Sequence, residues 1–123
     1  MIKVNDYEIE FTKIPNGETN MHHGSFPDLA TEYHVYVSFK YEDDSDLIKL
    51  LFVKEYLDSL PNERYYYLTI YSMPYGRMDR SEKGSPFTLK YVSKLINNMK
   101  FNEVNIIEPH SNVTPALVNN SYS

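Results

Sequence analysis

The chain has no cysteine, and this absence removes several kinds of chemistry at once. Without cysteine there is no disulfide framework, no thiolate metal site and no cysteine nucleophile. Long apolar runs are also missing, and none approaches the roughly 18 residues that a membrane-spanning helix needs. The first residues, Met1 to Asp6, mix polar and apolar types, unlike a signal peptide. We therefore expect a cytoplasmic protein with no membrane partner.

Positive charge is scarce as well. The 12 lysines and arginines are outnumbered by 17 aspartates and glutamates, which gives a formal net charge of −5. Binding to the phosphate backbone of nucleic acid requires a basic face. The balance therefore argues against a general affinity for nucleic acid and leaves room for a local basic patch.

Tryptophan is absent, whereas tyrosine is abundant, with 12 residues beside 6 phenylalanines. Tyrosine combines packing area with a polar tip, which suits sheet faces, interfaces and partly open clefts. We interpret most of these tyrosines as half-buried packing residues.

The length of 123 residues and the apolar share of 41% predict one domain with a real core. Alternation of apolar and polar residues, or short apolar runs, predict strands at 7–11, 33–39, 64–71 and 104–107. Helical spacing of apolar residues predicts helices at about 46–60, opened by the acidic run 42–46, and at about 87–99. Alternation of strands and helices is typical of an α/β fold. We expect a mainly parallel sheet flanked by helices.

Two loops stand out between these elements. Pro15-Asn16-Gly17 is a turn signal, because proline presets one backbone angle and glycine accepts the left-handed one. The stretch from Ser72 to Pro86 is long, polar and rich in charge, and long loops of this kind are often functional.

In parallel sheets, ligands bind beyond the carboxyl ends of the strands. One such end runs from Tyr71 into a segment that contains Arg77, and another runs from Ile107 into His110. An arginine fork binds phosphate, and an imidazole binds a metal or a metal-bound phosphate. The pair predicts a nucleotide or polyphosphate site, while the alternative of a solvated arginine and a capping histidine stays open.

Five segments, in order and at consistent separations, resemble the ribose-phosphate pyrophosphokinases (PRPP synthetases). Tyr75 to Arg80 resembles the family's PYARQDR loop, and Glu108 to Ser111 resembles its DLHA segment. The other three segments are 14–19, 35–51 and 86–92. The resemblance spans most of the chain and implies the N-terminal, phosphoribosyltransferase-like half of such an enzyme.

The resemblance implies a specific activity. The family transfers pyrophosphate from ATP to ribose 5-phosphate with Mg²⁺, through positioning and cationic clamps on the phosphates. By carry-over, Arg77 and Asp79 would bind nucleotide and His110 would lie at the Mg²⁺–triphosphate end. Asn16 and Glu18 would contact adenine from a neighbouring subunit, which implies a homo-oligomer with a nucleotide site at its interface.

Four positions depart from the family pattern. Met78 stands where the family has glutamine, Ile14 replaces a phenylalanine, and Glu108-Pro109 replaces Asp-Leu before the histidine. These departures leave open a related acceptor, such as ADP-ribose, and a weakened regulatory paralogue.

The family's second half, with an acidic pair before a phosphate-cradling loop, has no counterpart here, so we expect a single domain over 1–123. The run Glu42-Asp43-Asp44 lacks the glycine and threonine of such a loop, and is interpreted as a solvated helix cap. His22-His23 is interpreted as part of a loop rather than as a metal site. Three hypotheses follow: a half-enzyme, a non-catalytic module for nucleotide binding or oligomerisation, and, least favoured, a structural domain without a ligand.

Overall fold

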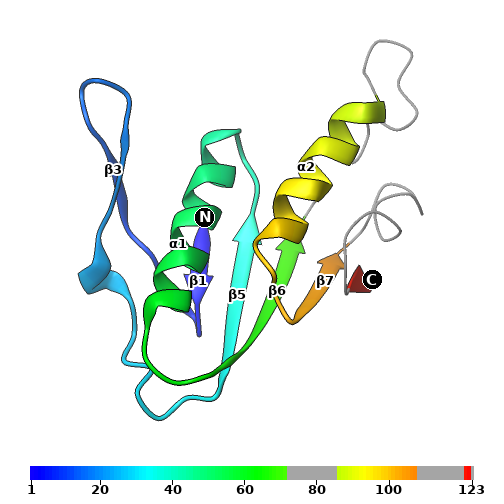
Figure 1. Ribbon diagram of the computed structural model, residues 1–123. Coiled ribbons are helices and arrows are strands. Elements are labelled where there is room, and N and C mark those ends of the chain that lie inside the picture. The colour runs from blue at the N-terminus through cyan, green and yellow to red at the C-terminus, as the bar shows by residue number, and fades with distance from the viewer. Residues whose placement is uncertain (72–85, 108–120, 123) are drawn as a thin grey trace.

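The computed structural model describes residues 1–71, 86–107 and 121–122, and the side chains of 1–71 and 88–107 (Figure 1). Its strands are β1 (Ile2–Val4), β2 (Tyr7–Glu8), β3 (Phe11–Lys13), β4 (Thr19–Met21), β5 (His34–Lys40), β6 (Tyr65–Tyr71), β7 (Glu103–Ile107) and β8 (Ser121–Tyr122). Its helices are η1 (His23–Ser25), α1 (Ser45–Ser59) and α2 (Pro86–Asn98).

The described strands form one sheet in the order β2-β1-β5-β6-β7-β8 and a separate hairpin of β3 with β4. Parallel pairing joins β5 to β6, β6 to β7 and β7 to β8, whereas β1 is antiparallel to both β2 and β5. With the antiparallel β3–β4 pair included, three described pairings are parallel and three are antiparallel. The prediction of a mainly parallel sheet is therefore corrected to a mixed α/β arrangement.

The antiparallel edge arises from a turn that we did not predict. Asn5 and Asp6, between β1 and β2, have φ angles of 45° and 69°. Positive φ at both central residues is the geometry of a type I′ turn, which asparagine and aspartate tolerate better than most residues. The turn reverses the chain, so β2 pairs antiparallel with β1, which is itself antiparallel to β5.

The predicted strand over 7–11 is also corrected. The chain leaves the main sheet after β2, and Phe11 starts β3 in the separate hairpin. Tyr7 is consequently 59% exposed while Ile9 is buried, so these two residues do not share a face. The turn predicted at Pro15 to Gly17 is confirmed, because it joins β3 to β4 with Gly17 at φ 94°.

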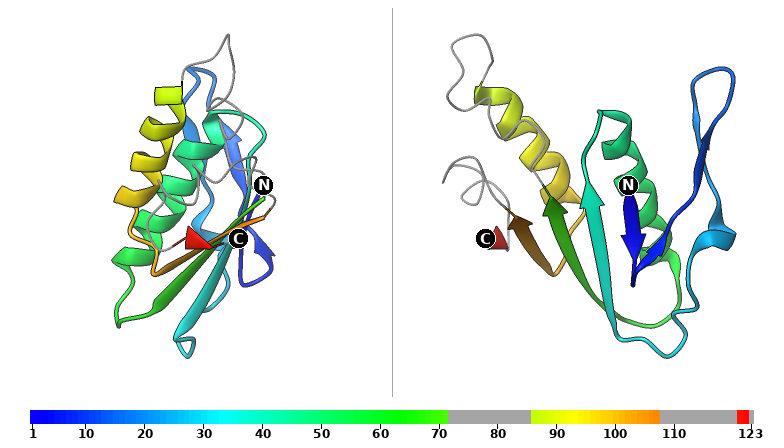
Figure 2. Two further views of the ribbon diagram at one scale, coloured as in Figure 1. Left: turned by 90° about the vertical axis from the view of Figure 1, so that its right-hand side faces the viewer. Right: turned by 180° about the vertical axis from the view of Figure 1, so that it is seen from behind.

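Both α1 and α2 lie on the same face of the sheet, as Figure 2 shows in its edge view. The chain moves from β5 to β6 to β7 in one direction across the sheet. Right-handed crossovers taken in one direction place their helices on one side. In the part of the chain that the structure describes, the sheet is therefore covered by helices on one face rather than flanked on both.

The core lies between this face and the two helices. Alternate residues of β5, namely Val35, Val37 and Phe39, are buried, and β6 and β7 alternate in the same way. The helices contribute Leu50, Val53, Leu57, Leu89 and Ile96. Burial of each such side chain contributes roughly 1.5–3 kcal/mol, so the predicted core and the two predicted helices are confirmed.

Candidate functional site

The carboxyl ends of the three central strands meet at one edge of the sheet. Lys40, the last residue of β5, pairs with Tyr71, the last of β6, and Tyr71 pairs with Ile107, the last of β7. The prediction that the ends at Tyr71 and Ile107 are neighbours is confirmed. Parallel strands bring such ends together because each begins from the same opposite edge.

The two segments predicted to carry the phosphate chemistry follow these strand ends in the sequence. Arg77 and Asp79 come after β6, and His110 comes after β7. All three lie outside the described residues, so their roles stay predictions. The described structure supplies the edge from which both segments start.

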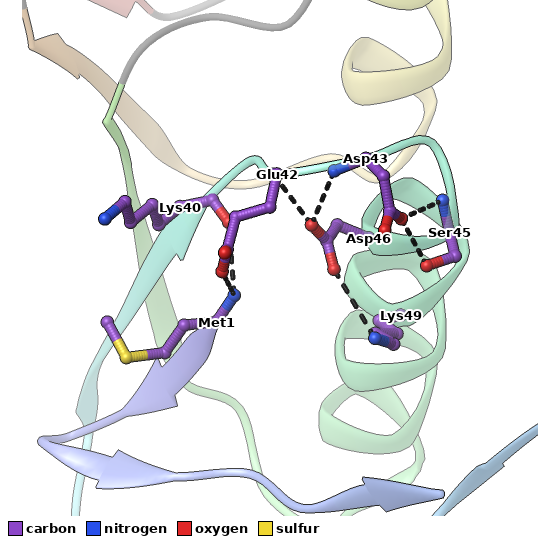
Figure 3. Close-up of polar contacts among 7 residues, drawn as sticks. All are labelled: Met1, Lys40, Glu42, Asp43, Ser45, Asp46 and Lys49. Atoms are coloured by element: carbon purple, nitrogen blue, oxygen red, sulfur yellow. Dashed lines mark hydrogen bonds and ion pairs between the residues drawn. The ribbon is translucent and has the colours of Figure 1, made fainter. Parts of the chain in front are cut away.

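The connection from β5 to α1 is held by carboxylates (Figure 3). Asp46 is 4% exposed, and its Oδ2 accepts hydrogen bonds from the backbone N–H groups of Glu42 (2.8 Å) and Asp43 (3.1 Å). Its Oδ1 lies 3.5 Å from Lys49 Nζ. A buried carboxylate is tolerated when it accepts several hydrogen bonds, so Asp46 fixes this loop, while Glu42, Asp43 and Asp44 are exposed, as expected of a solvated run.

Asp43 lies one residue before the N-cap of α1 and bonds to Ser45. Its Oδ1 accepts the backbone N–H of Ser45 at 2.9 Å and also the Ser45 hydroxyl. These two hydrogen bonds favour the carboxylate form and hold the pKa of Asp43 below its ordinary value of 3.8. The N-cap residue of α1 is Asp44, which makes no side-chain capping hydrogen bond, so the capping function predicted for the acidic run is corrected.

An open hollow of about 700 Å³ lies beside this loop, between α1, β2 and the β3 end of the hairpin. It is lined by Met1, Ile2, Glu8, Ile9, Glu10, Phe11, Thr12, His22, Glu42, Asp43, Asp46 and Lys49. Its positive groups are already paired, since the Met1 amino group lies 3.3 Å from Glu42 Oε1 and Lys49 contacts Asp46. The excess of carboxylates disfavours a phosphate ligand here.

The hairpin tip carries the other two predicted nucleotide contacts. Asn16 Oδ1 accepts the backbone N–H of Glu18 at 3.0 Å, and Asn16 Nδ2 donates to Glu18 Oε1. Both side chains are exposed. Figures 1 and 2 place the hairpin on the far side of α1 from α2 and β6. Within one chain, the described structure therefore does not bring Asn16 and Glu18 to the carboxyl ends of β6 and β7.

The described residues offer no metal centre of their own. No group of three or more histidine, aspartate or glutamate side chains among them is arranged to hold a metal ion. The only Mg²⁺ residue implied by the resemblance, His110, lies outside the described part. In the described part, no helix has the length and apolar character needed to cross a membrane.

Sequence reasoning missed the exposed tyrosines of the uncovered sheet face. Tyr36 is 54% exposed and stacks on Tyr67, with ring centres 4.6 Å apart and an angle of 9° between the rings. The signal was present, because Tyr36 and Tyr67 occupy alternate positions opposite the apolar residues of β5 and β6. We interpreted most tyrosines as half-buried packing residues, so the sequence did not indicate that this face of the sheet lacks a described helix.

Comparison with known proteins supports the fold. No family model and no curated protein matches the chain. Among solved structures, phosphoribosylpyrophosphate synthetase from Mycobacterium smegmatis is similar, with a TM-score of 0.66 and 16% sequence identity. The match covers 94% of this chain and 38% of that chain, so this chain spans well under half the length of its structural neighbour. At this identity the likeness shows a PRPP synthetase-like fold.

Proposed function

We propose that this chain is the nucleotide-binding, N-terminal-type half of a ribose-phosphate pyrophosphokinase-like enzyme. It binds the triphosphate of ATP with Mg²⁺ at the carboxyl ends of β6 and β7. Together with a second domain or partner chain that holds the sugar phosphate, it transfers pyrophosphate to ribose 5-phosphate or to a related acceptor such as ADP-ribose.

One observation carries the proposal. The fold resembles PRPP synthetase over 94% of the chain. In that fold Tyr71 and Ile107 are direct neighbours at the ends of β6 and β7. The two segments with the sharpest motif resemblance, 75–80 and 108–111, follow these residues in the sequence.

The chemistry of the predicted residues suits this function. Arginine presents a planar fork that matches phosphate oxygens, and histidine binds metal or metal-bound phosphate. Transfer of phosphoryl groups depends on positioning and on stabilisation of charge, so an incomplete site still binds nucleotide. We therefore expect binding, rather than transfer, to be the activity of this chain by itself.

Calorimetric titration of the purified chain with ATP and Mg²⁺ tests the proposal, with ADP-ribose titrated in parallel. We expect saturable binding of ATP, weakened at least about tenfold by Arg77→Ala, because a charge-assisted bidentate contact is lost. Lys94→Ala on the exposed side of α2 removes the same charge and serves as the control. Absence of ATP binding, or equal affinity of Arg77→Ala and Lys94→Ala, contradicts the proposal.

A second candidate function is a non-catalytic module that oligomerises with a full-length enzyme. The departure at Met78, where the family has glutamine, favours it, because a hydrogen bond to the nucleotide is lost. Mixing the chain with a complete enzyme of the family separates the candidates. Association without any nucleotide binding by this chain supports the module and excludes the half-enzyme.

A further inference from the structure

A second hollow lies on the uncovered face of the sheet, at the opposite end of β5 from the proposed nucleotide edge. Its volume is about 610 Å³, and it is lined by Asn5, Asp6, Thr31, Glu32, Tyr33, His34, Tyr36 and Ser38. The hollow lies along β5 from His34 to Ser38, whereas the nucleotide edge begins beyond Lys40. The two sites therefore share a strand without sharing residues.

Aromatic rings form part of the wall of this hollow. Tyr33 and Tyr36 are 55% and 54% exposed. Tyr36 stacks on Tyr67, so one face of its ring is covered and its exposure comes from the rest of the ring. Tyr33 meets the ring of His34 edge to face at 5.0 Å and 90°. The faces of such rings carry negative potential and attract cations.

The charged groups of the hollow have one sign. Asp6 and Glu32 contribute carboxylates, and no lysine or arginine is among the lining residues. Among the described residues, neither carboxylate makes an ion pair or a side-chain hydrogen bond. An anionic ligand is therefore disfavoured, and a cation gains attraction from both the carboxylates and the rings.

The backbone around the hollow is held in place before any ligand binds. Asn5 bonds Tyr36 twice, since its backbone N–H donates to the Tyr36 carbonyl at 2.8 Å and its Oδ1 accepts the Tyr36 N–H at 2.8 Å. Arg64 Nε donates to the carbonyl of Glu32 at 3.1 Å, and the N–H of Tyr65 donates to the carbonyl of Tyr33 at 2.8 Å. A fixed wall lowers the ordering cost of binding.

We propose that this hollow binds a lysine or arginine side chain of a partner protein. The cationic head lies between the tyrosine faces and the carboxylates of Asp6 and Glu32, and the aliphatic stem packs on the rings. The proposal is independent of the proposed nucleotide function, because no residue of the hollow belongs to the nucleotide edge.

A nuclear magnetic resonance titration of the full chain tests this inference. The probes are Nα-acetyl-lysine amide and Nα-acetyl-arginine amide, compared with the neutral Nα,Nε-diacetyl-lysine amide. We expect saturable shifts at the rings and backbone amides of Tyr33 and Tyr36 with either charged probe, and little shift with the neutral one. Equal shifts with charged and neutral probes, or none with either charged probe, overturn the proposal.

A matched pair of double variants isolates the carboxylates. Asp6→Asn/Glu32→Gln keeps the shape of the site and is expected to weaken binding of the charged probes by about fivefold or more. Asparagine also tolerates the positive φ at position 6. Glu10→Gln/Glu55→Gln removes the same charge from exposed positions that do not line this hollow and should leave the affinity within about twofold. Equal weakening in both double variants shows a general charge effect and rejects the site.

The two proposals fail separately. Asp6→Asn/Glu32→Gln should leave binding of ATP with Mg²⁺ unchanged. If the unmodified chain does not bind ATP but shows the tyrosine shifts, only the nucleotide function is rejected. Intact ATP binding without the tyrosine shifts rejects the cation site alone.

Discussion

Tyr71 and Ile107 pair directly at the ends of two parallel strands, β6 and β7. This pairing gives the segments that contain Arg77 and His110 a common starting edge. It turns two motifs that are about thirty residues apart in the sequence into a single proposed site for a metal-bound triphosphate, and it leads to a prediction for each of them.

The first prediction concerns His110 and Mg²⁺. Removal of Mg²⁺ with a chelator should weaken ATP binding to the unmodified chain, because the metal neutralises phosphate charge. His110→Ala should weaken binding in the presence of Mg²⁺ and shrink this difference, since the histidine acts through the metal. Calorimetry with and without chelator measures both effects. A variant that keeps the full Mg²⁺ dependence contradicts the predicted role of His110.

A second prediction concerns the hairpin tip. The β3–β4 hairpin, which carries Asn16 and Glu18, lies on the far side of α1 from β6, so the nucleotide contacts predicted for these residues require another subunit. We expect self-association of the chain, and we expect Asn16→Ala/Glu18→Ala to weaken ATP binding only at concentrations where the chain is assembled. Sedimentation and ATP titration over the same concentration range measure this coupling. A chain that stays monomeric, with ATP affinity unaffected by the double variant, contradicts the interface site.

A third prediction tests a buried charge in α1. Lys54 is 3% exposed, and its Nζ lies 2.7 and 2.9 Å from the carboxylate oxygens of Asp58. The same Nζ lies 4.9 Å from the ring centre of Tyr66 and 5.3 Å from that of Phe101. Asp58→Asn should lower the free energy of unfolding by about 1–2 kcal/mol, less than for a fully buried pair because Asp58 is half exposed.

The matched variant is Lys54→Met, which keeps an unbranched stem and removes the charge. It should change the free energy of unfolding by less than about 1 kcal/mol, because both the ion pair and its desolvation cost disappear. Urea unfolding measures both variants. If Lys54→Met loses more free energy of unfolding than Asp58→Asn, the unpaired Lys54 ammonium is not the main cause of the destabilisation in Asp58→Asn.

The fourth prediction concerns alkaline pH. Burial raises the pKa of Tyr66 above its ordinary value of 10.0. Above pH 10 the unfolded chain releases this proton while the folded chain retains it, so stability is fully present below pH 10 and falls as the pH rises through the folded value. Unfolding in urea at pH values on both sides of 10 should show this decline.

Tyr66→Phe should flatten the alkaline decline in stability, because the titrating group is gone. It should also cost about 1 kcal/mol at neutral pH, since the Tyr66 hydroxyl donates to the carbonyl of Leu57 at 2.9 Å. Tyr7→Phe, at a position that is 59% exposed, is the control and should keep the decline. If stability declines equally in Tyr66→Phe at alkaline pH, a group other than Tyr66 causes the decline.

Local patterns predicted the part of the fold that is built from local crossovers. Alternation in β5 and helical spacing in α1 identify a buried face directly, so the unit from β5 to β7 follows from the sequence. The antiparallel edge of the sheet was harder to predict. Strand β1 has only three residues and depends on pairing with β5, more than thirty residues away. Short strands carry too few alternations to be recognised without their partners.

The candidate site was predictable to a similar extent. The neighbouring strand ends follow from the order of the elements, whereas the contacts of Asp46 do not. Its neighbours Glu42 to Asp44 have the composition of a solvated run, and only the folded loop shows two backbone N–H groups directed at one buried carboxylate. The cation hollow was not predicted for the same reason, since Asp6 and Glu32 line one hollow only after β1 pairs with β5.

The pairing of β1 with β5 also sets the order in which a nascent chain completes its structure. Ile2 pairs with Phe39 and Val4 with Val37, so the first strand leaves the ribosome well before its partner. Until then Ile2 and Val4, both buried in the finished protein, remain open to solvent. Long-range pairings of this kind form slowly and expose apolar surface in the interval. During synthesis, β1 is therefore a segment on which a chaperone can act until β5 has emerged.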